Sequence, residues 1–167
     1  TARVQAGEAD LREQYLADPD VAGFLQQRSQ LIDEVLCDLW RAMQFPDALA
    51  LIAVGGYGRG ELWPESDIDL LLLLPVSADD RLSEQIEQLI ALCWDIGLEL
   101  GHSVRTVGEC LEEAQADLTV QTALAEARLL TGDSALFATL RAEFNSTLDP
   151  QTFFHTKLIE QHERYVR

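Results

Sequence analysis

Residues 51–75 read LIAVGGYGRGELWPESDIDLLLLLP, and this stretch decides the fold. An apolar run ends at Gly55 and Gly56, a glycine-rich loop follows, and Asp67 and Asp69 then open a run of five leucines. Two apolar runs of this length around a loop predict two buried strands. An unpaired charge is costly to bury. A buried strand that opens with two carboxylates therefore predicts a cation beside them, and we expect a divalent metal ion.

The spacing of the two aspartates suits a metal site. Side chains alternate along a strand, so Asp67 and Asp69 share one face, with their Cα atoms about 6.5–7 Å apart. Magnesium takes oxygen ligands and often shares its coordination shell with substrate phosphates. At the end of the first strand, Gly55 and Gly56 have no Cβ and let the backbone approach a phosphate closely. Together these features predict nucleotide chemistry with Mg²⁺.

Other glycine-loop sites do not fit this stretch. A dinucleotide fingerprint starting at Gly56 would need a glycine where Glu61 stands. A P-loop needs a lysine after its glycines, and the sequence has none between Thr1 and Lys157. An EF-hand would need a third oxygen ligand where Leu71 stands.

A glycine pair followed by Asp-x-Asp at a strand start resembles the signature of the DNA polymerase beta superfamily of nucleotidyltransferases. Two longer stretches, GGYGRGELWPESDIDLL at 55–71 and the segment at 94–133, resemble the bifunctional PII uridylyltransferase/uridylyl-removing enzymes of bacterial nitrogen signalling. The likeness covers roughly residues 30–167. The two stretches in this order make the resemblance specific.

The resemblance implies a fold and an activity. The fold would be α/β (α+β), a small mixed sheet of the polymerase-beta-like type with flanking helices. The activity would be transfer of UMP from UTP to a tyrosine of the PII protein, with Mg²⁺ held by Asp67 and Asp69. The residues do not exclude another nucleotide or acceptor, or a nucleotide-binding or partner-binding module without catalysis.

Three further residues are candidates for nucleotide binding, and each has a plain structural alternative. The resemblance implies that Arg59 lies near the triphosphate, although Arg59 could pair with Glu61 or Glu65. Ser66 could bind phosphate or orient Asp67, or could simply form a turn. Arg105 could face the acidic site and balance its charge, or could lie on the surface of a strand.

The superfamily often has a third carboxylate that helps to deprotonate the attacking hydroxyl. Glu99 is our candidate, because it alternates onto the face of Ser103 and Arg105 in a strand predicted over 97–107. His102, on the opposite face, is expected to be a core histidine.

Composition narrows the class of protein. The 167 residues are 47% hydrophobic and 25% charged, which is typical of a soluble globular protein. A net charge of −17 argues against a nucleic-acid surface. No apolar run reaches the length of about 18 residues that a membrane span needs, and no signal peptide is visible. Cys37, Cys93 and Cys110 predict free thiols in a reducing cytoplasm.

We expect three regions: an N-terminal helical segment (1–46), a nucleotidyltransferase core (47–116) and C-terminal helices (117–167). The start at Thr1 and the end inside a predicted helix suggest a fragment of a longer protein. Asp117 and Asp133 are predicted helix N-caps, and Gly132 a helix stop. The first predicted helical region covers 8–43 and is interrupted at 18–20. The other predicted helices cover 82–96, 109–115, 118–130, 134–144 and 152–166. The predicted strands cover 48–54, 70–74 and 97–107.

Overall fold

The fold is built on a mixed sheet of four strands. A computed structural model describes residues 2–148. The strands β1 (Ala50–Ala53), β2 (Ile68–Leu74), β3 (Leu100–Thr106) and β4 (Arg128–Gly132) lie in the order β3-β2-β1-β4. β1 is antiparallel to both of its neighbours, whereas β2 and β3 run parallel. A small mixed sheet with flanking helices was predicted, and it is confirmed.

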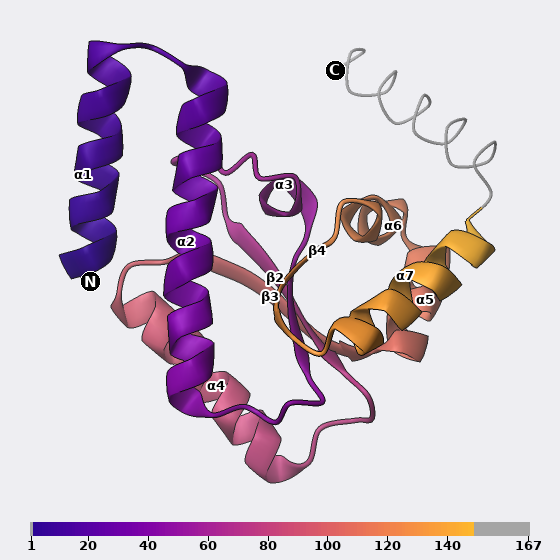
Figure 1. Ribbon diagram of the computed structural model, residues 1–167. Helices are drawn as coiled ribbons and strands as arrows, with labels where there is room; N and C mark the ends of the chain where they lie inside the picture. Colours follow the sequence, from indigo (N-terminus) through magenta and orange to yellow (C-terminus); the bar gives the residue numbers. More distant parts are fainter. Residues whose placement is uncertain (1, 149–167) are drawn as a thin grey trace.

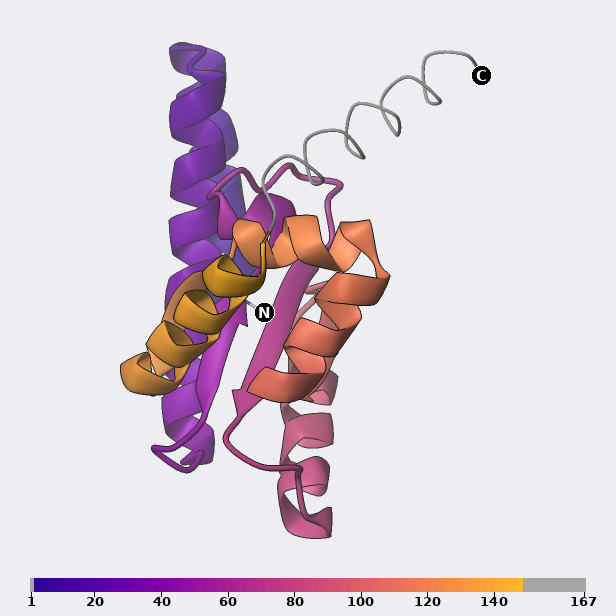
Figure 2. The ribbon, with the colours of Figure 1, turned by 90° about the vertical axis from the view of Figure 1, so that its right-hand side faces the viewer.

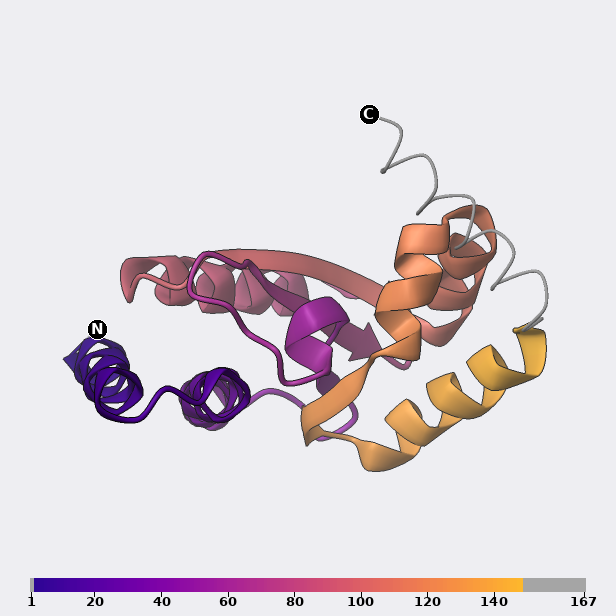
Figure 3. The same cartoon turned by 90° about the horizontal axis from the view of Figure 1, so that it is seen from above.

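Helices cover both faces of the sheet (Figures 1 and 3). One face carries α2 (Val21–Met43), with α1 (Ala2–Ala17) outside it, and α4 (Asp80–Asp95). The other face carries α5 (Val107–Ala116), α6 (Leu118–Ala125) and α7 (Ser134–Thr147), which face the viewer in Figure 2. A single turn, α3 (Gly55–Gly58), follows β1 directly.

The leucine run of β2 is explained by burial on both faces. Leu70, Leu72 and Leu74 pack into the core beneath α2 and α4, and Leu71 and Leu73 pack into the core beneath α5–α7. Strands buried on both faces read as continuous apolar runs rather than as alternating ones. β2 is therefore the central support of the sheet.

The N-terminal helices form a hairpin that packs beside the core. The predicted break at 18–20 is confirmed, and Asp20 caps α2 by accepting a hydrogen bond from the amide of Gly23. Arg28 of α2 is buried and bonds Glu8 of α1 at 3.0 Å. The same guanidinium donates to three consecutive carbonyls of the loop before β2, those of Leu62, Trp63 and Pro64, at 3.4, 2.6 and 3.4 Å.

The prediction of one helix over 118–130 is wrong. α6 ends at Ala125, and residues 128–132 form β4, which pairs with β1. The short apolar run near Leu129 fits a helix and a buried strand equally well by pattern alone. Gly132 does not stop a helix: it ends β4 at φ 98°, where an added Cβ would lie 2.1 Å from the Leu49 carbonyl oxygen. Asp117 and Asp133 are N-caps, as predicted.

β3 begins at Leu100 rather than at residue 97, because Gly97 with φ 88° turns the chain after α4. The helix predicted over 152–166 lies outside the described residues. Among the residues that the structure describes, no helix combines the length and the apolar character needed to cross a membrane.

Arg28→Met is expected to lower the free energy of unfolding by about 2–4 kcal/mol, because it leaves loop carbonyls without a donor and Glu8 without its partner. Chemical denaturation measures this. Arg41→Met is the control: the Arg41 side chain is 71% exposed on the same helix, and its loss should change stability by less than about 0.5 kcal/mol. Equal effects of the two substitutions would contradict the role given to Arg28.

Burial also predicts an order of thiol reactivity. Cys93 and Cys110 are buried and Cys37 is half-buried. Burial raises the pKa of the Cys93 and Cys110 thiols to about 11. At pH 8 the thiolate fraction of each is therefore about one in a thousand. Thiolates are the reactive form. Iodoacetamide at pH 8, followed by mass spectrometry, should modify Cys37 first and all three thiols in urea. Rapid labelling of Cys93 in the folded chain would refute this order.

Candidate active site

Asp67 and Asp69 stand where β1 ends and β2 begins. Asp69 is the second residue of β2, and its backbone oxygen accepts a hydrogen bond from the amide of Val54 at 3.1 Å. Ile68, between the two aspartates, donates its amide to the Glu99 carbonyl at 2.9 Å. Both aspartates are exposed residues. The expectation that they would be buried is therefore wrong: the strand enters the core only after Asp69.

The Asp69 carboxylate lies beside two glycines, and the lack of a Cβ at Gly101 leaves it room. Gly55 has φ 60°, and a Cβ there would lie 3.4 Å from Asp69 Oδ2. Gly101 pairs with Asp69 in the parallel register of β2 and β3, and a Cβ there would lie 2.4 Å from Asp69 Oδ1. Real Cβ atoms essentially never approach that closely, so the carboxylate occupies the space that a side chain at 101 would fill. Sequence reasoning missed Gly101, and only the strand register could have found it.

The carboxylate pair carries uncompensated negative charge. Partial burial, and then the charge of Asp67, raise the pKa of Asp69 above its ordinary value. Within residues 2–148 neither side chain forms an ion pair or a hydrogen bond. Magnesium is commonly held by one or two carboxylates, with waters and substrate phosphates completing its shell. The two aspartates fit that ion.

Glu99 does not complete a three-carboxylate metal group. It lies just before β3 rather than within it, and it lines a shallow hollow with Asp67 and the exposed Trp94. In the described part of the chain, no cluster of three or more His, Cys, Asp or Glu side chains is arranged to hold a metal. Asp67 and Asp69 therefore remain the candidate metal ligands, and Glu99 lines a hollow with Asp67.

The glycine-rich turn lies directly beside this pair. Gly56 is in α3, and a Cβ there would meet its nearest neighbours at 3.5 and 3.7 Å, ordinary contact distances. The chain's own packing therefore does not require a glycine at 56. Gly58 is different, because a Cβ there would lie 2.2 Å from the Glu126 carbonyl oxygen.

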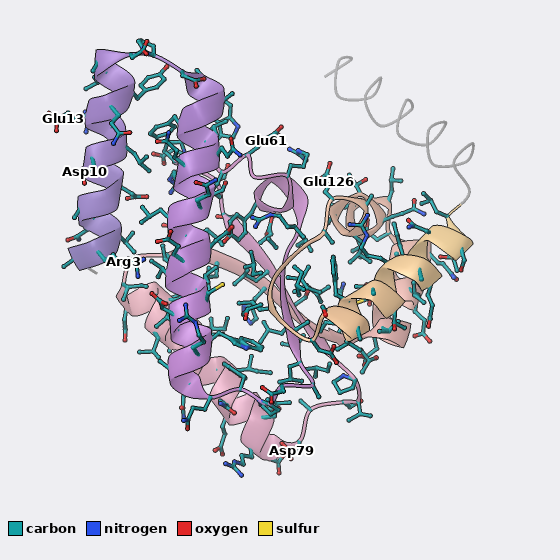
Figure 4. The ribbon with its side chains drawn as sticks, viewed as in Figure 1. Arg3, Asp10, Glu13, Glu61, Asp79 and Glu126 are labelled. Atoms are coloured by element: carbon teal, nitrogen blue, oxygen red, sulfur yellow. The ribbon has the colours of Figure 1, made fainter. Side chains whose placement is uncertain are left out.

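Arg59 is held by two carboxylates. It forms an ion pair with Glu61 at 2.9 Å, as the structural alternative to a triphosphate-binding role predicted, and a second ion pair with Glu126 at 2.6 Å. Glu61 and Glu126, labelled in Figure 4, flank α3 from the glycine loop and from the α6–β4 connection. Glu126 was not predicted, because its approach to Arg59 depends on β4.

Arg105 and Ser66 differ in their surroundings. Arg105 lines a hollow of about 370 Å³ together with Asp69, Gly101 and residues of α6. Its only ion pair among the described residues is a loose one with Glu113, at 3.8 Å. Ser66 is exposed, and its amide donates to the Trp63 carbonyl in a turn. His102 is exposed at the edge strand, so the expectation of a core histidine is wrong.

Comparison with known proteins agrees with this geometry. A protein-family model described as "Nucleotidyltransferase domain" matches residues 32–130. That range contains β1, the glycine turn, both aspartates, β3 and the start of β4. The match therefore covers every element that builds the site.

Curated relatives are similar over nearly the whole chain. A bifunctional uridylyltransferase/uridylyl-removing enzyme of Aromatoleum aromaticum is 46% identical over 99% of this chain. The enzyme of the same name from Cupriavidus pinatubonensis is 51% identical over 81% of it. The chain spans only 19% and 16% of the length of these two relatives.

Among solved structures, a chain in a crystal structure of the toxin–antitoxin MntA–HpeT aligns with a TM-score of 0.47 and 13% identity, over 80% of this chain and 94% of that chain. That likeness is too distant to bear on function. The family model, in contrast, covers more than half of the chain. The chain belongs to the nucleotidyltransferase domain family.

Proposed function

We propose that this domain is a magnesium-dependent nucleotidyltransferase that transfers UMP from UTP to a tyrosine hydroxyl of the PII signalling protein, in the cytoplasm. The observation that carries the metal-nucleotide site is the Asp69 carboxylate, lodged between Gly55 and Gly101 beside Asp67 with no cation partner. The names of the relatives support uridylyl transfer. PII as the acceptor rests on the resemblance of residues 55–71 and 94–133.

The roles of the residues follow from their positions. Asp67 and Asp69 would hold the magnesium, which neutralises charge on a triphosphate. Gly55 and Gly56 leave the turn α3 free of side chains beside the aspartates, so a phosphate can approach the backbone. Glu99, close to Asp67, is the candidate to take the proton from the acceptor hydroxyl.

The basic and hydroxyl groups around the pair would complete the site. Arg59 would exchange Glu61 or Glu126 for phosphate oxygens, since a guanidinium binds both with the same fork of donors. Arg105 would meet negative charge in the hollow next to Asp69, and Ser66 would hydrogen-bond phosphate or orient Asp67. Positioning and charge stabilisation would then supply most of the catalysis.

Calorimetric titration of nucleoside triphosphates with magnesium tests the site. UTP is expected to bind only when magnesium is present, and an Asp67→Asn/Asp69→Asn variant that still folds is expected to lose binding by about a hundredfold or more, because both metal ligands are gone. A panel of ATP, CTP and GTP decides base preference and so separates uridylyl transfer from transfer of another nucleotide.

The control for charge is a Glu84→Gln/Glu87→Gln variant, which removes two negative charges from exposed positions of α4. It should bind UTP like the wild type. Failure of the folded wild type to bind any triphosphate would refute the metal-nucleotide site and leave a partner-binding module as the alternative. Binding followed by uridylylation of purified PII would support the full proposal.

Gly101→Ala is expected to lower nucleotidyl transfer about tenfold or more, since the new Cβ forces the Asp69 carboxylate out of its place and small displacements at a reacting centre are costly. The transfer rate at saturating nucleotide measures this. Gly108→Ala is the matched control, because a Cβ at Gly108 meets nothing within 4 Å. Equal rates for the two variants would mean that the position of Asp69 does not matter.

A further inference from the structure

One cluster of charged and aromatic side chains outside the carboxylate pair is built around the glycine turn. It joins Asp33 of α2, Tyr57 of α3 and Arg128 at the start of β4. In the sequence, Tyr57 lies 24 positions from Asp33 and 71 from Arg128, and Asp33 lies 95 positions from Arg128. None of them faces Asp67 or Asp69 in the hollows that border the pair.

Asp33 is the centre of the cluster. Its Oδ1 accepts hydrogen bonds from the Tyr57 hydroxyl at 2.6 Å and from Arg128 Nη2 at 3.1 Å. Its Oδ2 accepts from Arg128 Nη1 at 2.6 Å. The bidentate pair is half-buried, with side-chain exposures of 35% for Arg128 and 24% for Asp33. Such two-pronged pairs between arginine and a carboxylate fix geometry as well as charge.

Arg128 also holds the backbone of the turn. Its Nε donates to the Gly58 carbonyl and its Nη2 to the Tyr57 carbonyl, each at 3.2 Å. The guanidinium carbon lies 5.5 Å from the centre of the Tyr57 ring, which is itself buried. One side chain therefore ties the end of α3 to α2 and to β4.

The turn needs this support. A helix of four residues is far too short to be stable on its own, and no side chain caps the N-terminus of α3. Its first residue is Gly55, and a Cβ there would lie 3.4 Å from Asp69 Oδ2. Movement of Tyr57 and Gly58 would therefore move the glycine pair relative to the carboxylates.

We propose that Asp33, Tyr57 and Arg128 are positioning residues that hold α3 in the geometry in which it binds the triphosphate. The inference rests on the proposed function. It adds that nucleotide affinity depends on a contact between α2 and β4 that involves neither aspartate. None of the three residues needs to touch the nucleotide.

The test combines nucleotide affinity with hydrogen exchange. Asp33→Asn and Arg128→Lys each break the two-pronged pair, and lysine cannot replace the fork of donors. Tyr57→Phe removes one hydrogen bond and keeps the buried ring. In the presence of magnesium, Asp33→Asn and Arg128→Lys are each expected to bind UTP about tenfold more weakly than the wild type. Tyr57→Phe is expected to weaken UTP binding by only a few-fold. The Asp33→Asn/Arg128→Lys double variant should lose little more than either single one, since the residues act as a unit.

Hydrogen exchange reports on the turn without any nucleotide. Four backbone amides close the turn by hydrogen bonds: those of Gly58, Arg59, Gly60 and Glu61. In the variants these amides should exchange about tenfold faster, while the amides of β2 keep their rates. Arg41→Ala, which removes an exposed arginine from the far end of α2, should change neither readout.

The outcomes separate this inference from the proposed function. Wild-type protein that binds no triphosphate overturns both. Wild-type protein that binds UTP, with folded variants that bind it equally well, overturns the positioning role alone. Faster exchange spread evenly over β2 and α4 would show general loss of stability and would also overturn it.

Discussion

The candidate site depends on one constraint: a strand that is buried on both faces begins with carboxylates, and partial burial, followed by the charge of Asp67, raises the pKa of Asp69. Asp67 immediately precedes β2 and Asp69 is its second residue, and neither side chain forms an ion pair among the described residues. The strand can begin this way because both residues remain exposed, whereas the five leucines that follow are buried on both faces. The negative charge is thus confined to the start of β2, next to the buried leucines that form an apolar platform for the site. A binding partner that brings positive charge there would relieve the repulsion.

The platform also explains where the glycines are needed. Asp69 is fixed between Val54 on one side and Gly101 on the other by the backbone hydrogen bonds of the sheet. Its carboxylate then occupies the space that a Cβ at Gly101 would fill. Strand register, a property of the sheet, therefore determines that a glycine of β3 lies opposite Asp69. Catalysis by positioning depends on such placement of the groups around the reacting centre.

The sequence predicted the part of the site that is contiguous in the chain, and missed the part that depends on pairing. Gly55, Asp67 and Asp69 lie within fifteen residues, and their pattern alone suggested both the turn and the metal pair. Gly101 becomes significant only once β3 is placed parallel to β2 in register. Glu126 and Arg128 were missed for a related reason: their segment was read as helix, because a short apolar run does not distinguish a helix from a buried strand. Glu99 was placed in a strand that begins one residue after it.

Two arginines beside the glycine turn differ in what their surroundings allow. Arg59 is 44% exposed, and its partners Glu61 and Glu126 lie in loops, so its pairs contribute little to stability and can be exchanged for another anion. Arg128 makes two bonds to one carboxylate and two to backbone carbonyls in a half-buried position, and breaking them would leave polar groups unsatisfied. Ion pairs that another anion can replace suit a residue that binds the substrate. A guanidinium whose hydrogen bonds go to protein groups suits a residue that positions the turn. By this reasoning Arg59 belongs to the binding surface and Arg128 to its support. Arg59 lies in the glycine-rich stretch at 55–71, and Arg128 lies in the second stretch that carries the resemblance, 94–133.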